Sequence, residues 1–207
     1  MTTGGEGGLF LTDDEDVWQR AWAYKDHGKS WATVHEAAHP AGFRWLHESF
    51  GTNWRMTEMQ AAIGRRQLMK LDDWIERRTR NAALLEAGLK DVPGIITVAM
   101  PDWAAPAYYK YYAFVDPEKL AEGWNRTRVV DAIAAEGVPC FVGSCGEIYR
   151  EKAFAQAGLG PEERLPEAMR QGETSLMFLI HPTLGEAEMS DACRAVEKVM
   201  AVAVGAG

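Results

Sequence analysis

An asparagine and an arginine stand two residues apart, just before a helix whose beginning is clear from the sequence. Asn53 and Arg55 precede Thr57 and Gln60, which have the three-residue spacing of a capping box. In a capping box the threonine hydroxyl accepts from the glutamine backbone N–H, and the glutamine side chain reaches back. A helix N-terminus carries free N–H groups and partial positive charge, so a phosphate would be favoured beside Asn53 and Arg55. An ordinary capped helix after a loop is the alternative interpretation.

The capping box opens a periodic stretch that predicts one long amphipathic helix, straight or bent, ending near Gly88. The helix dipole alone contributes only about 0.3–1 kcal/mol at an exposed end, so side chains and other loops must supply the rest of any anion affinity. The apolar residues that recur mostly at three- and four-residue spacing include Met59, Ala62, Ile63, Leu68, Leu71, Trp74, Ile75, Ala82 and Leu85.

A second pattern with possible chemistry is His35-Glu36-Ala37-Ala38-His39, which matches H-E-x-x-H. On a helix this spacing presents two zinc ligands on one face, with the glutamate as base, and Glu58 would be a candidate third ligand. Pro40 directly follows the second histidine and disfavours helical geometry there. The segment also lacks the apolar periodicity of a buried zinc-binding helix. A zinc hydrolase therefore remains an alternative hypothesis that metal analysis would test.

Composition narrows the class of protein. The chain has 207 residues and a formal net charge of −8, which argues against a general nucleic-acid binder. No stretch is long and apolar enough to span a membrane, so neither nucleic acid nor membrane is expected as a partner. The three cysteines, Cys140, Cys145 and Cys193, form neither a disulfide framework nor a recognisable metal set, and this favours a reducing cytoplasm.

The remaining elements predict an α/β fold. Acidic residues 13–16 indicate the start of a first helix, which ends at His27 and Gly28, and a long loop follows. After residue 91 short strands alternate with helices, which predicts a compact α/β layer. Gly143 and Ser144 lie in a loop that could approach a ligand. The expected strands are 95–98, 108–115, 138–142 and 175–180, and the expected helices are 127–136, 149–156, 165–173 and 186–202.

Taken together, these stretches resemble the DegT/DnrJ/EryC1/StrS family of sugar aminotransferases, which are pyridoxal-phosphate enzymes of fold type I. The resemblance covers essentially the whole chain, and the block from Gly51 to Gly64 is its most specific part. Several blocks in the right order make coincidence a poor explanation. The matching residues are 2–8, 26–28, 51–64, 67–72, 137–139 and 179–182.

The resemblance implies the C-terminal part of a fold type I enzyme. Residues 1–55 would be a large-domain remnant with an active-site loop, 56–90 a connecting helix and 91–207 a small α/β domain. The lysine that forms the Schiff base would lie just upstream of Met1, so the chain is expected to be a fragment that is inactive alone. Lys25, Lys29 and Lys110 are expected to be surface charges. Because related dehydratases replace that lysine, aminotransferase and dehydratase chemistry both stay open.

The resemblance also implies roles for particular residues. Asn53 would reach the phosphate of pyridoxal 5′-phosphate across a homodimer with shared active sites. Arg55 would face the diphosphate of a nucleotide-sugar substrate, or would form a structural ion pair with Glu58 or another acid. Gly143, Ser144 and Tyr149 would lie toward the substrate, although aromatic or histidine side chains commonly follow the preceding turn in the family.

The expected activity is therefore amino transfer from an amino-acid donor to a keto-sugar nucleotide, with pyridoxal 5′-phosphate as cofactor. The departure from the family pattern at Gly143 and Ser144 leaves the sugar and the nucleotide undefined. A noncatalytic binding or assembly module is a further alternative, and poor cofactor uptake with specific dimerisation would favour it.

Overall fold

The computed structural model describes residues 4–39, 41–42 and 44–205. Thr2 and Thr3, at the start of the glycine-rich stretch, and Pro40, beside the H-E-x-x-H pattern, lie outside the described residues. The chain divides into two compact units, Thr2–Leu71 and Asp72–Gly207.

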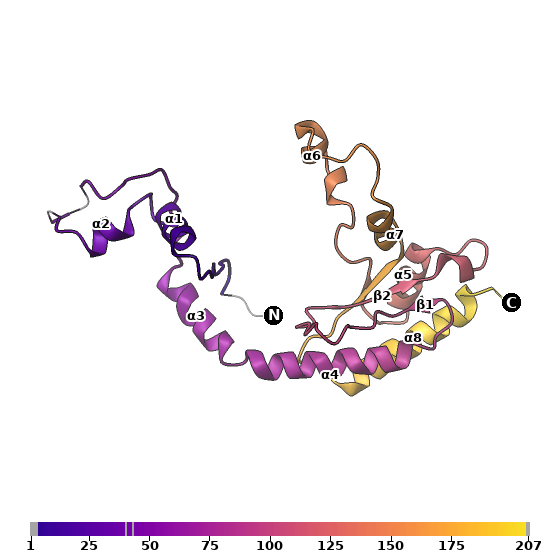
Figure 1. The fold of residues 1–207 in the computed structure, drawn as a ribbon. Coiled ribbons are helices and arrows are strands. Elements are labelled where there is room, and N and C mark those ends of the chain that lie inside the picture. Colours follow the sequence, from indigo (N-terminus) through magenta and orange to yellow (C-terminus); the bar gives the residue numbers. More distant parts are fainter. Residues whose placement is uncertain (1–3, 40, 43, 206–207) are drawn as a thin grey trace. The chain divides into compact units, whose positions relative to one another are not determined.

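Within its described residues, the first unit contains the helices α1 (Glu15–Lys25), α2 (Trp31–His35) and α3 (Glu58–Leu68) (Figure 1). As predicted, an acidic residue starts α1, because the side chain of Asp14 accepts from the backbone N–H of Val17. The chain leaves α1 through His27 and Gly28, both at positive φ. Helices α1 and α2 meet through tryptophan rings, with the centroids of Trp22 and Trp31 separated by 5.1 Å.

The capping box predicted for α3 is confirmed, with both reciprocal hydrogen bonds between Thr57 and Gln60 present. The expected single long helix is instead two helices, α3 and α4 (Leu71–Leu89), separated by a turn at Met69 and Lys70. Helix α3 buries none of its residues, whereas α4 buries Ala82, Leu85 and Leu89. The periodic pattern is continuous in the sequence, but only its second part packs into a core.

The second unit is built on a four-stranded sheet of order β1-β2-β4-β3, in which every neighbouring pair is antiparallel. The predicted alternation of short strands and helices is confirmed, although the strands are shorter than the sequence suggested. Strand β2 alternates buried and partly buried residues, while β4 is buried throughout. The strands are β1 (Ile95–Ile96), β2 (Tyr111–Val115), β3 (Cys140–Phe141) and β4 (Ser175–Phe178).

Helices α4, α5 (Arg126–Ala135) and α8 (Glu186–Ala203) supply the rest of this unit's core. Their apolar stripes bury residues such as Leu85 and Ile133, each fully removed from solvent. Helix α7 (Pro166–Thr174) stands at the base of an arm that carries α6 (Lys152–Ala157) (Figure 1). Short 3₁₀ turns are η1 (Pro117–Lys119) and η2 (Ile148–Arg150). None of the helices in the described ranges is long and apolar enough to cross a membrane.

Candidate functional site

A short antiparallel ladder in the first unit holds Asn53 in place. The backbone N–H of Thr52 donates to the carbonyl of Tyr24 over 2.6 Å, and the N–H of Trp54 donates to the carbonyl of Lys25 over 2.9 Å. Asp26 and Asn53 face each other across this ladder. Gly51 is required at its start, because a Cβ there would lie only 2.7 Å from the Tyr24 carbonyl oxygen. The ladder therefore fixes the backbone from which the Asn53 and Arg55 side chains project.

Asp26 is a buried carboxylate surrounded by three cations. Its Oδ1 lies 3.3 Å from Lys29 Nζ and 3.6 Å from Arg55 Nε, and its Oδ2 lies 3.9 Å from Lys25 Nζ. Burial raises the pKa of this carboxyl, but the hydrogen bond from Lys29 and the three positive charges together bring the pKa below its usual value. The group carries three positive charges and one negative charge, so it retains a local excess of positive charge.

Arg55 is held on one side and open on the other. Its Nε donates to Asn53 Oδ1 over 3.0 Å, and one terminal nitrogen lies 3.4 Å from His27 Nε2. The side chain is 49% exposed. The ion pair considered from the sequence thus forms with Asp26, and a guanidinium anchored in this way still exposes N–H groups that can bind an anion. The side chains of Asn53 and Arg55, which are separated by one residue, border the same space.

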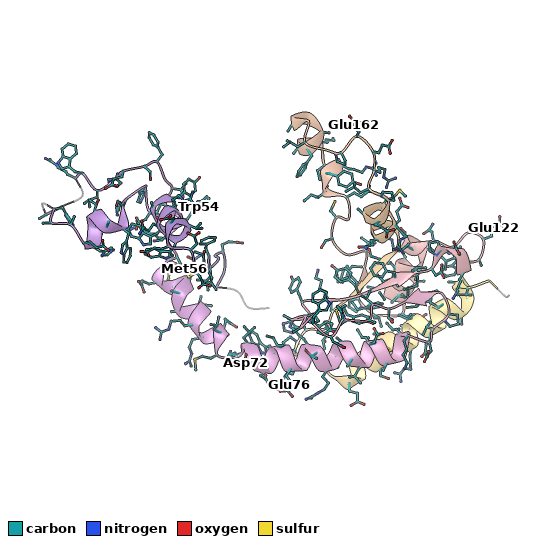
Figure 2. All side chains as sticks on the ribbon, in the orientation of Figure 1. Trp54, Met56, Asp72, Glu76, Glu122 and Glu162 are labelled. Atoms are coloured by element: carbon teal, nitrogen blue, oxygen red, sulfur yellow. The ribbon has the colours of Figure 1, made fainter. Side chains whose placement is uncertain are left out.

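That space is a recess of about 1100 Å³ within the first unit. Asn53, Arg55 and Lys25 supply its polar wall, and Trp54 lies beside α1 while Met56 lies at the start of α3 (Figure 2). The rest of the lining comes from the glycine-rich segment with the two residues after it, from α1, and from Gln60 of α3. These residues are Glu6, Gly7, Gly8, Leu9, Phe10, Trp18, Ala21, Trp22, Tyr24 and Gln60.

The lining fits a ligand that combines a phosphate with a flat ring. Lys25 and Arg55 offer positive charge, and Asn53 offers an amide. Gly7 and Gly8 have no side chains, so a ligand can approach their backbone closely. The indole rings around the recess provide apolar surface that suits a planar group.

The H-E-x-x-H pattern does not form the helix that zinc binding would need. Helix α2 ends at His35, Glu36 is its C-cap, and His39 lies beyond it with Nε2 3.3 Å from the Val34 carbonyl oxygen. The His35 ring packs on Trp31 at a centroid distance of 3.9 Å. Within the part of the chain that the structure describes, no three histidine, cysteine, aspartate or glutamate side chains converge on a possible metal position.

The other predicted site residues, Gly143, Ser144 and Tyr149, belong to the second unit. Gly143 follows β3 at a φ of 85°, and a Cβ there would lie 2.8 Å from Tyr112 Cε1. This position therefore needs glycine for both backbone and space. Ser144 is exposed and Tyr149 is half-buried.

The Tyr149 hydroxyl already has two partners in the arm that carries α6. It donates to Glu147 Oε1 over 2.6 Å and accepts from the Leu165 N–H over 2.9 Å. Glu147 also accepts from Arg164 Nε over 2.9 Å. Hydrogen bonds from Arg164 and Tyr149 lower the pKa of Glu147 to about 2. We conclude that the Tyr149 hydroxyl links Glu147 to Leu165 and so stabilises the arm.

Sequence reasoning missed Asp26 as the centre of the charge cluster, and it missed the pair Glu147–Arg164. Asp26 was visible only as part of the Asp26-His27-Gly28 block. Glu147 and Arg164 are 17 residues apart, a separation that no helical or strand period joins. Both pairings depend on how the chain folds back on itself.

A model of the DegT/DnrJ/EryC1/StrS aminotransferase family matches residues 1–197. Among curated proteins, the spore coat polysaccharide biosynthesis protein SpsC of Bacillus subtilis is 28% identical over 95% of this chain and 50% of its own length. The erythromycin biosynthesis sensory transduction protein EryC1 of Saccharopolyspora erythraea is 30% identical over 76% of this chain and 37% of its own. The chain spans about half the length of the curated relatives it matches, or less.

Solved structures agree with this match. An aminotransferase from Psychrobacter cryohalolentis is 49% identical with a TM-score of 0.85, and the similarity covers 92% of this chain and 50% of that one. DesV from S. venezuelae, solved in complex with a ketimine intermediate, is 26% identical with a TM-score of 0.74, over 92% of this chain and 46% of that one. Both neighbours therefore contain the elements described above together with further chain.

Proposed function

The chain belongs to the DegT/DnrJ/EryC1/StrS aminotransferase family, and we propose that it functions as part of a pyridoxal-phosphate-dependent sugar aminotransferase. The reaction would move an amino group from an amino acid to a keto-sugar nucleotide. The observation that carries the proposal is the recess beside Asn53 and Arg55, in which cations, an amide, glycine backbone and indole rings face one volume. This lining is chemically suited to a phosphorylated pyridine.

Within that function Asn53 and Arg55 would bind phosphate groups. Asn53 would donate its amide N–H groups to the cofactor phosphate, while its Oδ1 holds Arg55 Nε. Arg55 would direct its exposed N–H groups toward the diphosphate of the substrate, because a planar guanidinium can donate two parallel hydrogen bonds to such a group. Asp26 would keep the guanidinium oriented through their 3.6 Å ion pair.

When bound, pyridoxal 5′-phosphate would supply the electron sink that stabilises negative charge at the substrate carbon during amino transfer. The described lysines near the recess are poorly suited to the Schiff-base role, since Lys25 and Lys29 both face the Asp26 carboxylate. We therefore expect no turnover of a nucleotide-linked ketosugar with glutamate by the 207-residue chain alone.

We also propose that the working protein is a cytoplasmic homodimer with shared active sites. The first unit exposes large apolar side chains, which in soluble proteins mark surfaces for further protein contacts. Among its described residues the most exposed are Phe50, Leu11, Trp45, Leu9, Met59 and Met69. Three free thiols, on Cys140, Cys145 and Cys193, suit a reducing compartment. Sedimentation analysis of the purified protein measures the dimer directly.

Binding of pyridoxamine 5′-phosphate tests the proposal, because this form of the cofactor lacks the aldehyde that reacts with lysines. Trp18, Trp22 and Trp54 line the recess, so tryptophan fluorescence can follow the titration. We expect pyridoxamine 5′-phosphate to bind more tightly than pyridoxamine. Asn53→Ala should weaken binding of the phosphorylated form because the amide contact is lost. Arg55→Ala should weaken it by about tenfold, because Arg55 orients the Asn53 amide and places positive charge beside the phosphate.

Arg65→Ala is the matched control, since it removes the same charge from α3 of the same unit but does not line the recess. Equal affinity for the phosphorylated and unphosphorylated compounds would contradict the proposed phosphate site. The same conclusion would follow if Arg65→Ala weakened binding as much as Arg55→Ala.

A further inference from the structure

The side-chain amide of Gln60 forms hydrogen bonds through both its oxygen and its nitrogen. Its Oε1 accepts from the backbone N–H of Thr57 over 3.0 Å and from the Thr57 hydroxyl over 2.9 Å. Its Nε2 donates to the backbone carbonyl of Glu6 over 2.6 Å. The first set of bonds caps α3, whereas the last one reaches 54 residues back along the chain. A single residue therefore joins the start of α3 to the glycine-rich segment.

An independent observation shows that this segment lies tightly against α3. A Cβ at Gly4 would stand 3.0 Å from the backbone carbonyl oxygen of Gln60. Gly7 approaches Met56 in the same way, with its added Cβ 3.1 Å from the methionine methyl group. A side chain at Gly4 would press on the backbone of α3, whereas one at Gly7 would meet only the flexible end of the Met56 side chain. The glycines allow the approach, and the Gln60 amide supplies a directional bond that holds it.

We propose that Gln60 is a positioning residue, and that its amide fixes the wall of the recess formed by Glu6, Gly7 and Gly8. All three residues line the recess together with Gln60 itself. Asn53 and Arg55 approach the same space from the ladder, so a ligand that contacts both walls depends on their spacing. The identity of that ligand rests on the proposed function, whereas the link between α3 and the glycine-rich segment does not.

Only an amide can perform both tasks at this position. A carboxylate accepts hydrogen bonds but cannot donate, so Gln60→Glu keeps the acceptor for Thr57 and loses the bond to the Glu6 carbonyl. The added negative charge in the first turn of α3 also favours the helix. Gln60→Met keeps a similar length and loses both functions. Thr57→Ala weakens the cap and leaves the bond from Gln60 to Glu6 available.

Nitrogen relaxation by NMR on the 207-residue chain separates these effects. In the wild type we expect backbone order parameters for Gly7 and Gly8 near 0.85, as in a rigid backbone. In Gln60→Glu and Gln60→Met they should fall below about 0.6, the range of flexible segments. Thr57→Ala should lower order at Glu58 and Met59 and leave the glycines ordered. Glycines that remain equally ordered in both Gln60 variants would overturn the proposal.

Ligand affinity then tests positioning rather than stability alone. With pyridoxamine 5′-phosphate as the probe, Gln60→Met, which adds no charge to the recess that Gln60 lines, should weaken binding by about fivefold, the factor that corresponds to one lost hydrogen bond. Thr57→Ala weakens the cap of α3 and should bind as the wild type does, so a loss confined to Gln60→Met does not come from the weakened cap. Unchanged affinity in Gln60→Met would overturn the positioning role. Absence of binding in the wild type would count against the proposed function, and the relaxation data would still decide whether Gln60 holds the segment.

Discussion

Asp26 is the centre of the charged cluster in the first unit. It is 8% exposed, and it faces Lys25, Lys29 and Arg55. An isolated buried carboxylate would favour its neutral form, but these partners keep it charged. The sequence shows an unremarkable Asp-His-Gly run at this point, so the importance of the carboxylate follows only from the ladder that brings Arg55 beside it.

Asp26→Asn should destabilise the folded chain at pH 7. The change keeps the shape of the side chain and removes the negative charge that attracts Lys25, Lys29 and Arg55 at a site where the Asp26 side chain is only 11% exposed. We expect a loss of about 1–3 kcal/mol in the free energy of unfolding, measured by urea denaturation. Asp16→Asn, on the exposed face of α1, is the matched control and should have little effect.

The same variant should show a defined dependence on pH. The pKa of Asp26 in the folded chain lies below its ordinary value of 3.8. The ionised form therefore stabilises the fold fully above that value, and this contribution is lost as the pH falls through the lowered pKa. The stability difference between wild type and Asp26→Asn should shrink below pH 3.8. A difference that stays constant with pH would contradict the role of the charge.

Arg164→Ala should raise the pKa of Glu147 from about 2 toward its ordinary value of 4.5. Arg164 is the largest cause of the lowered pKa, through hydrogen bonds to both carboxylate oxygens. Titration of the Glu147 carboxyl carbon by NMR measures the change. Arg170→Ala is the control, because Arg170 pairs with Glu167 and should leave Glu147 unaffected.

The sign for stability follows from that pKa. Ionised Glu147 stabilises the fold fully above pH 4.5, and the contribution is lost as the pH falls toward 2. In Arg164→Ala the pKa of Glu147 in the folded chain lies closer to 4.5. The pH range over which Glu147 affects stability should therefore be narrower, with its lower limit moved up from about 2. If Glu147 still titrates near 2 in Arg164→Ala, the arginine does not hold the carboxylate as described.

At the scale of elements, local signals predicted the boundaries of most helices to within about three residues, but they did not reveal the break inside the long helix. The cap at Asp14 and the capping box of Thr57 and Gln60 are formed by neighbouring residues, so the sequence contains them completely. The break between α3 and α4 falls at Met69 and Lys70, where no glycine or proline marks it. It coincides with the boundary of the two compact units, which a helical period cannot reveal.

The lengths of the strands and the partners within the site likewise depend on contacts that the local sequence does not reveal. Strand β3 contains only Cys140 and Phe141, because its length is set by pairing with β4 rather than by its own composition. The sequence likewise indicated Asn53 and Arg55 through the cap that follows them. Their partner Asp26 comes from a segment more than twenty residues earlier, and only the folded ladder brings it beside them.

At the scale of the whole second unit, Gly88 reveals how closely α4 and α8 pack. The helix was predicted to end near Gly88, and α4 ends at Leu89, so the glycine lies inside its last turn. A Cβ at this glycine would lie 2.4 Å from Cys193 Sγ and 3.0 Å from Cys193 Cβ. The glycine therefore serves helix contact in a core where α4 and α8 both contribute buried residues.

Gly88→Ala should consequently destabilise the protein, although alanine favours a helix over glycine by about 1 kcal/mol. Forcing an extra methyl group into a packed contact costs about 1–3 kcal/mol, which outweighs that gain. Gly64→Ala is the matched control, because a Cβ at Gly64 in α3 meets nothing within 4 Å. We expect Gly64→Ala to be neutral or stabilising in urea denaturation.

A double variant tests the contact itself. Adding Cys193→Ala to Gly88→Ala removes the nearest atom and should recover part of the lost stability. The double variant should therefore be more stable than the sum of the two single changes predicts. Strict additivity, or a Gly88→Ala variant as stable as Gly64→Ala, would mean that α4 and α8 are not in contact at Gly88.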